Sequence, residues 1–442
     1  MREVLRQKML DGLTSPPPPL TRRDVRLPEV PGKALAVVGV RRSGKTTFLW
    51  QCLADRLQAG TPREALLLLS LEDDRLAGLS AADLAWLVEE YFRSQPGIRD
   101  ARTATFFLDE IQSVLGWETF ARRLVDTERV SLFLSGSSAR LLSREVATSM
   151  RGRALEVLVH PFSFREALRH LREEPDAPWN RLPKARRSAL DGRLRRYLAH
   201  GGFPETLGVE ERDRAALLRS YVDVVVLRDV IERHAVSNPL ALRWMQRHLL
   251  ANPAGLFSVQ KCYDALRSQG IPASKDSLHA YLGYLEDAFL VRTVSIHTAS
   301  ERQRMVNPRK VYPVDMGLIP LFDPAGRTNL GHALETAVLI ELQRRRCDVT
   351  YVRTTDGYEV DFMARRPDGG MELIQVCADA SAPETALREL RALEAAGKQY
   401  PKATCRLLTL TRDTAPAETP EGVLIQPAYE WILNTGNDGK NN

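Results

Sequence analysis

Cysteine is scarce in this chain of 442 residues, and its few copies lie far apart. The five cysteines contain no C-x-x-C pair, and the eight histidines are scattered. Zinc fingers, thioredoxin-like redox motifs and disulfide-stapled scaffolds all need close spacing, so these three classes are excluded. We therefore expect no zinc site and a reducing, cytoplasmic compartment.

Long apolar runs are lacking as well. The longest, such as residues 65–69 and 130–134, are far shorter than the roughly 18 residues that a membrane helix needs. The first ten residues, MREVLRQKML, have neither the apolar core nor the small-residue cleavage site of a secretory signal. We expect no membrane span and no secretion.

Strong charge of either sign is also missing. The formal net charge is +6, and hydrophobic residues make up 44% of the chain, as in ordinary globular proteins. This mildly basic balance is compatible with nucleic acid, but over such a length it does not require it.

Residues 34–160 contain short apolar runs that alternate with stretches of helical length. The runs lie at 34–40, 65–71, 103–110, 130–136 and 154–160, and each is apolar on both faces. Strands that are buried on both sides are typical of a parallel sheet covered by helices. The pattern predicts an α/β core.

The rest of the chain divides into further segments. Residues 1–33 are predicted to be a lead-in with Pro16–Pro19 as a stiff extended break, and 161–250 a helical lid. Residues 251–300 combine a helix, a Gly-containing turn, a second helix and a strand, which is typical of a winged helix-turn-helix. Another α/β domain is expected over 301–430, and a disordered tail over 431–442.

The strongest motif runs from Gly39 to Thr46. It reads G-V-R-R-S-G-K-T and fits G-x-x-x-x-G-K-[ST], directly after a predicted strand and before a helix. Glycines allow backbone N–H groups to surround phosphate oxygens, Lys45 is expected to reach the β- and γ-phosphates, and Thr46 to bind Mg²⁺. The predicted nucleotide-binding residues are Gly39, Arg41, Arg42, Ser43, Gly44, Lys45, Thr46 and Thr47.

Two acids and a serine are predicted to complete this site. The apolar run 103–110 ends in Asp109 and Glu110. We expect Asp109 to hold Mg²⁺ and Glu110 to polarise the attacking water. The next run ends near Ser137, which we expect to hydrogen-bond the water or the γ-phosphate; the alternative is that Ser137 belongs to a turn that caps the following helix.

Several stretches in order resemble a bacterial and archaeal family of AAA-superfamily ATPases with a C-terminal domain of unknown function. They are GVRRSGKTT, FLDEIQ, SGSSARLLSREVATSMRGR, HPFSFREAL, GGFPE and YEVDF. The resemblance implies ATP hydrolysis and a nuclease-like C-terminal fold. Arg151 and Arg153 match the R-G-R motif of the family, which implies a γ-phosphate sensor or a finger that acts between subunits of a homo-oligomer. The alternative is a surface salt-bridging pair.

The last domain resembles the restriction-endonuclease-like fold, whose metal site needs a strand carboxylate followed by E/Q-x-K. Here Asp361 follows that pattern, Gln375 takes the next position, and Glu335 is a further candidate ligand. Cys377, a neutral thiol near pH 7, stands where the lysine is expected. We therefore predict a vestigial, inactive site. Arg302, Arg304, Arg309 and Lys310 are predicted to form a solvated basic face.

Together these features predict a Mg²⁺-dependent AAA-like ATPase with a lid, a winged helix and a nuclease-like domain. ATP turnover would drive a conformational change, and DNA is a candidate partner. Two alternatives stay open at this point. One is an ATP-gated oligomeric switch or scaffold that hydrolyses slowly, and the other is an ATP-dependent nuclease, against which Cys377 argues.

Overall fold

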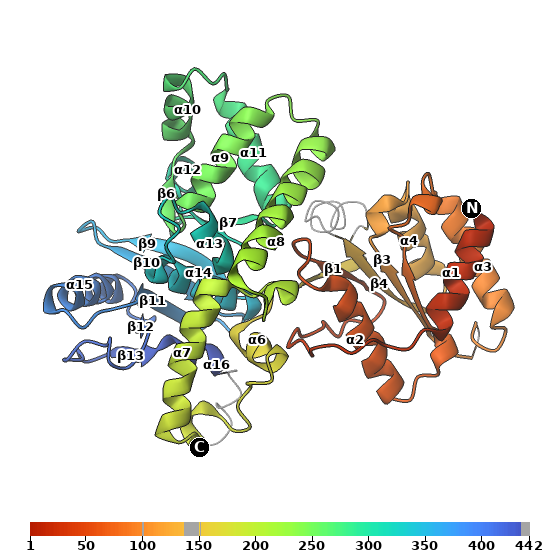
Figure 1. Cartoon of the computed structure of the whole chain (residues 1–442), viewed down its shortest axis with the longest axis horizontal. Helices are drawn as coiled ribbons and strands as arrows, with labels where there is room; N and C mark the ends of the chain where they lie inside the picture. The colour runs from red at the N-terminus through yellow and green to blue at the C-terminus, as the bar shows by residue number, and fades with distance from the viewer. Residues whose placement is uncertain (100, 137–149, 151, 435–442) are drawn as a thin grey trace. The chain divides into compact units, whose positions relative to one another are not determined.

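The computed structural model describes residues 1–99, 101–136, 150 and 152–434. The chain forms two compact units (Figure 1). The first consists of Met1–Val159 with Asp287–Phe289, and the second of His160–Glu286 with Leu290–Asn442. Each unit has a β-sheet of its own, so each is described separately.

The first unit is a five-stranded parallel sheet covered by helices. Its strands follow the order β2-β3-β4-β1-β5, and all four pairings are parallel. This confirms the predicted α/β core. The elements are α1 (Arg2–Thr14), β1 (Ala34–Val38), α2 (Lys45–Gln58), β2 (Leu66–Ser70), α3 (Ala81–Ser94), β3 (Ala104–Asp109), α4 (Trp117–Thr127), β4 (Val130–Gly136) and β5 (Ala154–Leu158).

Apolar side chains on both faces of the sheet explain why helices cover both sides. Phe48 of α2 packs in one cluster with Phe107 and Phe133. On the opposite face, the ring of Tyr91 in α3 meets the ring of Phe106 edge-on, with centroids 5.0 Å apart. Because successive strand residues point to opposite faces, Phe106 and Phe107 serve the two layers.

The N-terminal segment differs from the predicted lead-in, because residues 2–14 form helix α1 within the first unit (Figure 1). Leu5, Met9 and Leu13 recur every four residues and are buried, which is the spacing of one helix face. Gly12 lies so close to β2 that an added Cβ would meet the backbone oxygen of Leu68 at 2.2 Å. The helix therefore covers edge strand β2.

The second unit begins with helices and ends with a mixed sheet. Its elements are α6 (Phe164–His170), α7 (Lys184–His200), α8 (Glu211–Val224), a π-helical continuation (Val225–Glu232), α9 (Pro239–Ala251), β6 (Gly255–Phe257), α10 (Val259–Ser268), α11 (Lys275–Asp287), β7 (Val291–Val294), α12 (Glu301–Val306), β8 (Arg309–Pro313), α13 (Ile319–Phe322), α14 (Leu330–Arg344), β9 (Asp348–Arg353), β10 (Glu359–Arg365), β11 (Met371–Cys377), α15 (Pro383–Gln399), β12 (Thr404–Thr409), β13 (Val423–Pro427) and α16 (Ala428–Leu433). In these described ranges no helix is both long and apolar enough to cross a bilayer.

A small antiparallel sheet accompanies the two helices α10 and α11. Its strand order is β6-β8-β7, and the helices match those expected for the winged helix. Its third strand, β8, lies beyond residue 300, so the small sheet extends past the predicted boundary. The assignment as a winged helix remains a prediction.

The mixed sheet has the order β13-β12-β11-β10-β9, in which β9, β10 and β11 are antiparallel and β11, β12 and β13 parallel. Helix α14 packs on one face, with Val338 against Phe362 and Ile374. Helix α15 packs on the other, with Leu393 against Leu373. Residues 428–433 form the buried helix α16, so the predicted tail begins too early; residues 435–442 lie outside the described part.

We predict that Leu5→Ala destabilises the first unit by about 2–5 kcal/mol, since it removes a fully buried side chain between α1 and the sheet. Leu10 lies on the same helix but is 45% exposed, so Leu10→Ala is the matched control and should change stability little. Urea unfolding measures both. Equal, small effects would mean that α1 does not pack on the sheet in solution.

Candidate functional site

The predicted phosphate loop, residues 39–46, joins β1 to α2. Its backbone needs glycine at both ends, since Gly39 has φ 152° and Gly44 has φ 96°. A Cβ at position 39 would also meet the backbone oxygen of Val159 at 2.2 Å. The loop therefore curls tightly at the carboxyl end of a central strand and leads straight into the first turn of a helix, which favours anion binding.

Lys45 is the first residue of α2 and is buried, with 5% of its surface exposed. Its Nζ donates to the backbone oxygens of Gly39 and Val40, both at 3.2 Å. The ammonium thus lies across the loop. Together with the positive end of the helix dipole, it makes the loop a site for phosphate oxygens.

Thr46 and Asp109, the two residues predicted to hold Mg²⁺, meet at this loop. Thr46 Oγ1 donates to Asp109 Oδ2 at 2.8 Å, which joins the first turn of α2 to the end of β3. Asp109 is 3% exposed, and burial raises the pKa of its carboxyl group, although hydrogen bonds from Ser135 and Thr46 oppose the rise. A hydroxyl and a carboxylate are hard oxygen donors, so this pair fits Mg²⁺.

Ser135, which the sequence analysis did not select, holds the two acids in place. Its hydroxyl donates to Asp109 Oδ1 and accepts the backbone N–H of Glu110 at 3.1 Å. The predicted Ser137 lies outside the described residues. Strand β4 lies between β3 and β1, so the polar residue near its end was the available signal for Ser135.

Glu110 adopts a left-handed backbone conformation, with φ 55°, directly after β3. Its carboxylate accepts a hydrogen bond from the side chain of Gln112. A non-glycine residue in this conformation is uncommon and marks a sharp change of chain direction. The turn separates the positions of Asp109 and Glu110, although they are adjacent in sequence.

The remaining loop residues serve the backbone or face outward. Ser43 is fully buried and its carbonyl accepts from Arg23 Nη1 at 2.9 Å. Arg23 itself is 4% exposed, and the sequence analysis missed it because it falls in the predicted lead-in. Arg41 pairs with Glu72 at 3.8 Å, while Arg42 and Thr47 are exposed.

Arg153 lies at the amino-terminal ends of the strands, whereas the phosphate loop lies at their carboxyl-terminal ends. It precedes β5, whose Ala154 pairs with Ala34 at the start of β1, and it forms an ion pair with Asp126 at 2.6 Å. The loop follows the other end of β1, about 16 Å away along five strand residues. Arg153 therefore does not reach the loop of its own chain, which removes the role of a sensor in cis. Arg151 lies outside the described residues.

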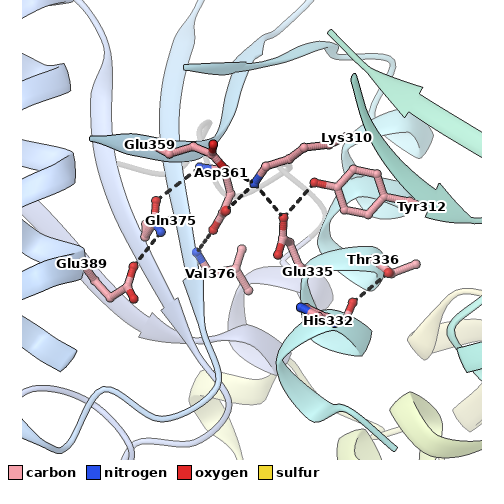
Figure 2. A network of polar contacts seen from close by, with 10 residues as sticks. All are labelled: Lys310, Tyr312, His332, Glu335, Thr336, Glu359, Asp361, Gln375, Val376 and Glu389. Carbon is pink, nitrogen blue, oxygen red and sulfur yellow. Dashed lines mark hydrogen bonds and ion pairs between the residues drawn. The ribbon is translucent and has the colours of Figure 1, made fainter. Parts of the chain in front are cut away.

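A second polar cluster lies in the second unit and contains three of the four residues predicted as a vestigial nuclease site (Figure 2). Glu335 projects from α14, Asp361 from β10 and Gln375 from β11. The N–H of Asp361 donates to Gln375 Oε1 at 3.2 Å, and that of Val376 donates to Asp361 Oδ2 at 3.0 Å. Asp361 lies where the pairing of β10 with β9 shifts between Val360 and Met363, an irregularity of the kind that redirects a side chain.

Cys377 does not join this cluster. Its Sγ contacts the carbonyl oxygen of Asp379 at 3.2 Å, and burial raises the pKa of the thiol to about 11. The thiol is therefore neutral at pH 7. Position 377 therefore supplies no cation.

The cation comes instead from Lys310 on β8, which was wrongly predicted to lie on a solvated basic face. Lys310 is 3% exposed, and its Nζ lies 2.8 Å from Asp361 Oδ1, 2.9 Å from Glu359 Oε1 and 3.2 Å from Glu335 Oε1. Tyr312, two residues along the strand, donates to Glu335 Oε1 at 2.7 Å. We call Lys310, Tyr312, Glu335, Glu359 and Asp361 the Lys310 cluster. The sequence signal for this cluster was the two-residue spacing of Lys310 and Tyr312, which places both side chains on the same face of a strand.

Glu335 should make the unfolding free energy of the chain depend measurably on pH. Burial, followed by the neighbouring Asp361, raises its pKa from 4.5 to about 8. Between these values the folded chain binds a proton that the unfolded chain releases, so this group lowers stability as pH rises. We predict that Glu335→Gln reduces the fall in unfolding free energy between pH 6 and 8, by at most about 1.4 kcal/mol per pH unit.

Urea unfolding at a series of pH values measures this slope. Glu384→Gln, on the exposed first turn of α15, is the control and should leave the slope unchanged. Identical slopes in Glu335→Gln and the wild-type chain would contradict a raised pKa for Glu335.

Comparison with known proteins places these features in a family. Residues 31–168 match the AAA domain family, and residues 191–326 match a domain of unknown function, DUF8612. An uncharacterized protein of Methanocaldococcus jannaschii is 32% identical over 422 residues, which cover 93% of this chain and 90% of that protein. An uncharacterized protein of Haemophilus influenzae is 30% identical over 349 residues, covering 79% and 82%.

Among solved structures, a Walker-type ATPase of Pyrococcus abyssi matches with a TM-score of 0.42 and 15% identity, covering 73% of this chain and 95% of that one. The Methanocaldococcus jannaschii relative covers nearly the whole chain, and the matched AAA domain contains the phosphate loop and both acids. The chain therefore belongs to a family of AAA-type ATPases in which the AAA domain is followed by a separate domain of unknown function.

Proposed function

We propose that this chain hydrolyses ATP to ADP and phosphate with the help of Mg²⁺ at the phosphate loop. The observation that carries the proposal is the 2.8 Å contact between Thr46 Oγ1 and Asp109 Oδ2. It brings a hydroxyl from the first turn of α2 together with a buried carboxylate at the end of β3. That pairing, beside a loop shaped for phosphate, supports a nucleoside-triphosphate site.

Each side chain has a distinct task in this proposal. Lys45 exchanges its contacts with Gly39 and Val40 for β- and γ-phosphate oxygens. Thr46 and Asp109 would hold Mg²⁺, which supplies positive charge beside the phosphates. Ser135 keeps Asp109 oriented, because its hydroxyl is bonded to both Asp109 and the backbone of Glu110.

Glu110 orients the attacking water in this proposal and accepts its proton. It directly follows Asp109 and has a left-handed backbone conformation, with φ 55°. Gln112 holds the carboxylate in place through a hydrogen bond. The water oxygen bonds to the γ-phosphorus as the bond to the β,γ-bridging oxygen breaks, and ADP leaves with that oxygen.

The alternative of a slowly hydrolysing, ATP-gated switch uses the same binding residues and differs only in rate. Steady-state turnover, with and without single-stranded, duplex and forked DNA, distinguishes the two. Turnover that DNA stimulates supports a motor or remodelling role. Tight ATP binding with turnover that stays negligible on every DNA supports the switch.

We predict that Lys45→Ala abolishes ATP binding, because the loop loses the charge that meets the phosphates.

We predict that Glu110→Gln retains binding but slows hydrolysis by roughly 10²-fold or more, the scale expected for a general base. Equilibrium binding of a fluorescent ATP analogue and phosphate release measure the two effects. Glu64→Gln, an exposed acid of the same unit, is the control. Hydrolysis by Glu110→Gln within about twofold of wild type would rule out this role.

An oligomer in which one subunit supplies an arginine to its neighbour also belongs to the proposal. Arg153 lies at the opposite end of its sheet from its own phosphate loop. An ATP phosphate that Arg153 contacts is therefore bound by another subunit. Arg151, two residues away, remains the second candidate. An arginine supplied in this way is worth about 10³–10⁵ in rate where it has been measured.

We predict that mixing Arg151→Ala or Arg153→Ala subunits with Lys45→Ala subunits restores part of the ATPase activity. One variant then contributes an intact loop and the other an intact arginine. Arg102→Ala, an exposed arginine of the same unit, should behave as wild type. A monomer whose turnover is independent of dilution, with no rescue on mixing, would leave Arg153 as the partner of Asp126 alone.

A further inference from the structure

The Lys310 cluster has the position of a metal site but a different occupant. It lies at the junction of α14, β10 and β11, where the restriction-endonuclease-like resemblance implies a divalent cation (Figure 2). Three acidic side chains converge on one point there. The atom at that point is Lys310 Nζ, at 2.8 Å, 2.9 Å and 3.2 Å from Asp361, Glu359 and Glu335.

The oxygens of Asp361 and Gln375, which a metal would need, are already committed. Asp361 Oδ1 accepts from Lys310, and Asp361 Oδ2 accepts the backbone N–H of Val376. Gln375 Oε1 accepts the N–H of Asp361, while its Nε2 donates to Glu389 Oε2 at 2.6 Å. Within the described ranges, no group of three or more His, Cys, Asp or Glu side chains is arranged to hold a metal ion. The residues present therefore do not fit the implied metal.

Charge and burial favour the ammonium as the permanent occupant. Burial by itself lowers the pKa of Lys310, but Asp361, Glu335 and Glu359 outweigh it and raise the pKa. The lysine is therefore charged at pH 7. Removing one member of a buried ion-paired group leaves the others uncompensated, so exchange of the ammonium for solvent is costly.

We infer that the ammonium of Lys310 takes the place of a divalent cation in the C-terminal domain and makes the cluster a structural lock instead of a hydrolytic metal centre. The lock fastens β8 to α14 and β10. It thereby joins the small sheet β6-β8-β7 to the mixed sheet, next to the hydrogen bond from Tyr351 Oη to the carbonyl of Pro308 at 2.8 Å. Tyr312 strengthens it from the same strand.

The inference predicts that a metal site appears when the lysine is removed. In Lys310→Met the carboxylates still converge but lack their cation. Oxygens now about 3 Å from Nζ need to move inward by less than ~1 Å to reach the 2.3–2.6 Å typical of Ca²⁺. We expect nucleotide-free Lys310→Met to bind one more Mn²⁺ or Ca²⁺ per chain than wild type, and to gain thermal stability on adding either ion.

Electron paramagnetic resonance of Mn²⁺ and calorimetry with Ca²⁺ count the ions bound to the full-length chain. Lys398→Met, an exposed lysine of the same domain, is the matched control and should bind as wild type. Adding Asp361→Asn to Lys310→Met should remove the extra ion. A folded Lys310→Met that binds no additional ion would overturn the inference.

The wild-type chain provides the deciding measurement if Lys310→Met does not fold. Without nucleotide, we expect Mn²⁺ binding that is the same in the wild type and in Asp361→Asn, and no cleavage of linear or circular DNA by either. Mn²⁺ binding that Asp361→Asn abolishes, or DNA cleavage that depends on Asp361, would show a working metal centre and overturn the inference. None of these outcomes depends on ATP hydrolysis.

Discussion

The hydrogen-bonded contact of Thr46, Asp109 and Ser135 is the interaction on which the candidate ATPase site depends. In the order β2-β3-β4-β1-β5, the strand that carries Asp109 is separated from the strand that leads into the phosphate loop by β4. Asp109 is therefore bonded to Ser135 on the intervening strand and to Thr46 on the far side. Each bond compensates part of the cost of burying a carboxylate.

Lys45 and Lys310 are both buried lysines whose ammonium groups contact oxygen atoms, but the charge of those oxygens differs. Lys45 donates to two backbone carbonyl oxygens, which are neutral and can be replaced by phosphate oxygens of greater negative charge. Lys310 meets three acidic side chains, so its charge is already compensated. The first arrangement favours binding of an anionic ligand, and the second favours a closed and permanent contact.

The predicted nuclease-like site also shows that one motif position does not reveal whether the site contains a cation. Cys377 correctly indicated that the usual strand lysine is absent. It gave no information on Lys310, which lies 51 residues before Asp361 in the sequence yet donates to it at 2.8 Å. The cation is present, but it comes from outside the predicted motif and approaches from a different strand.

The sequence by itself determined the phosphate loop, its two acids and the parallel sheet, because these depend on local backbone requirements and on apolar runs that alternate with helices. It also carried the pattern of α1 in Leu5, Met9 and Leu13, although the adjoining prolines favoured an extended segment. Only the tertiary structure decided that Ser135 links the acids, that Arg153 lies at the far edge from its own loop, and that Lys310 is buried. The local sequence offered only weak signals for Ser135 and Lys310, because all three arrangements follow from strand order and from contacts between residues far apart in the chain.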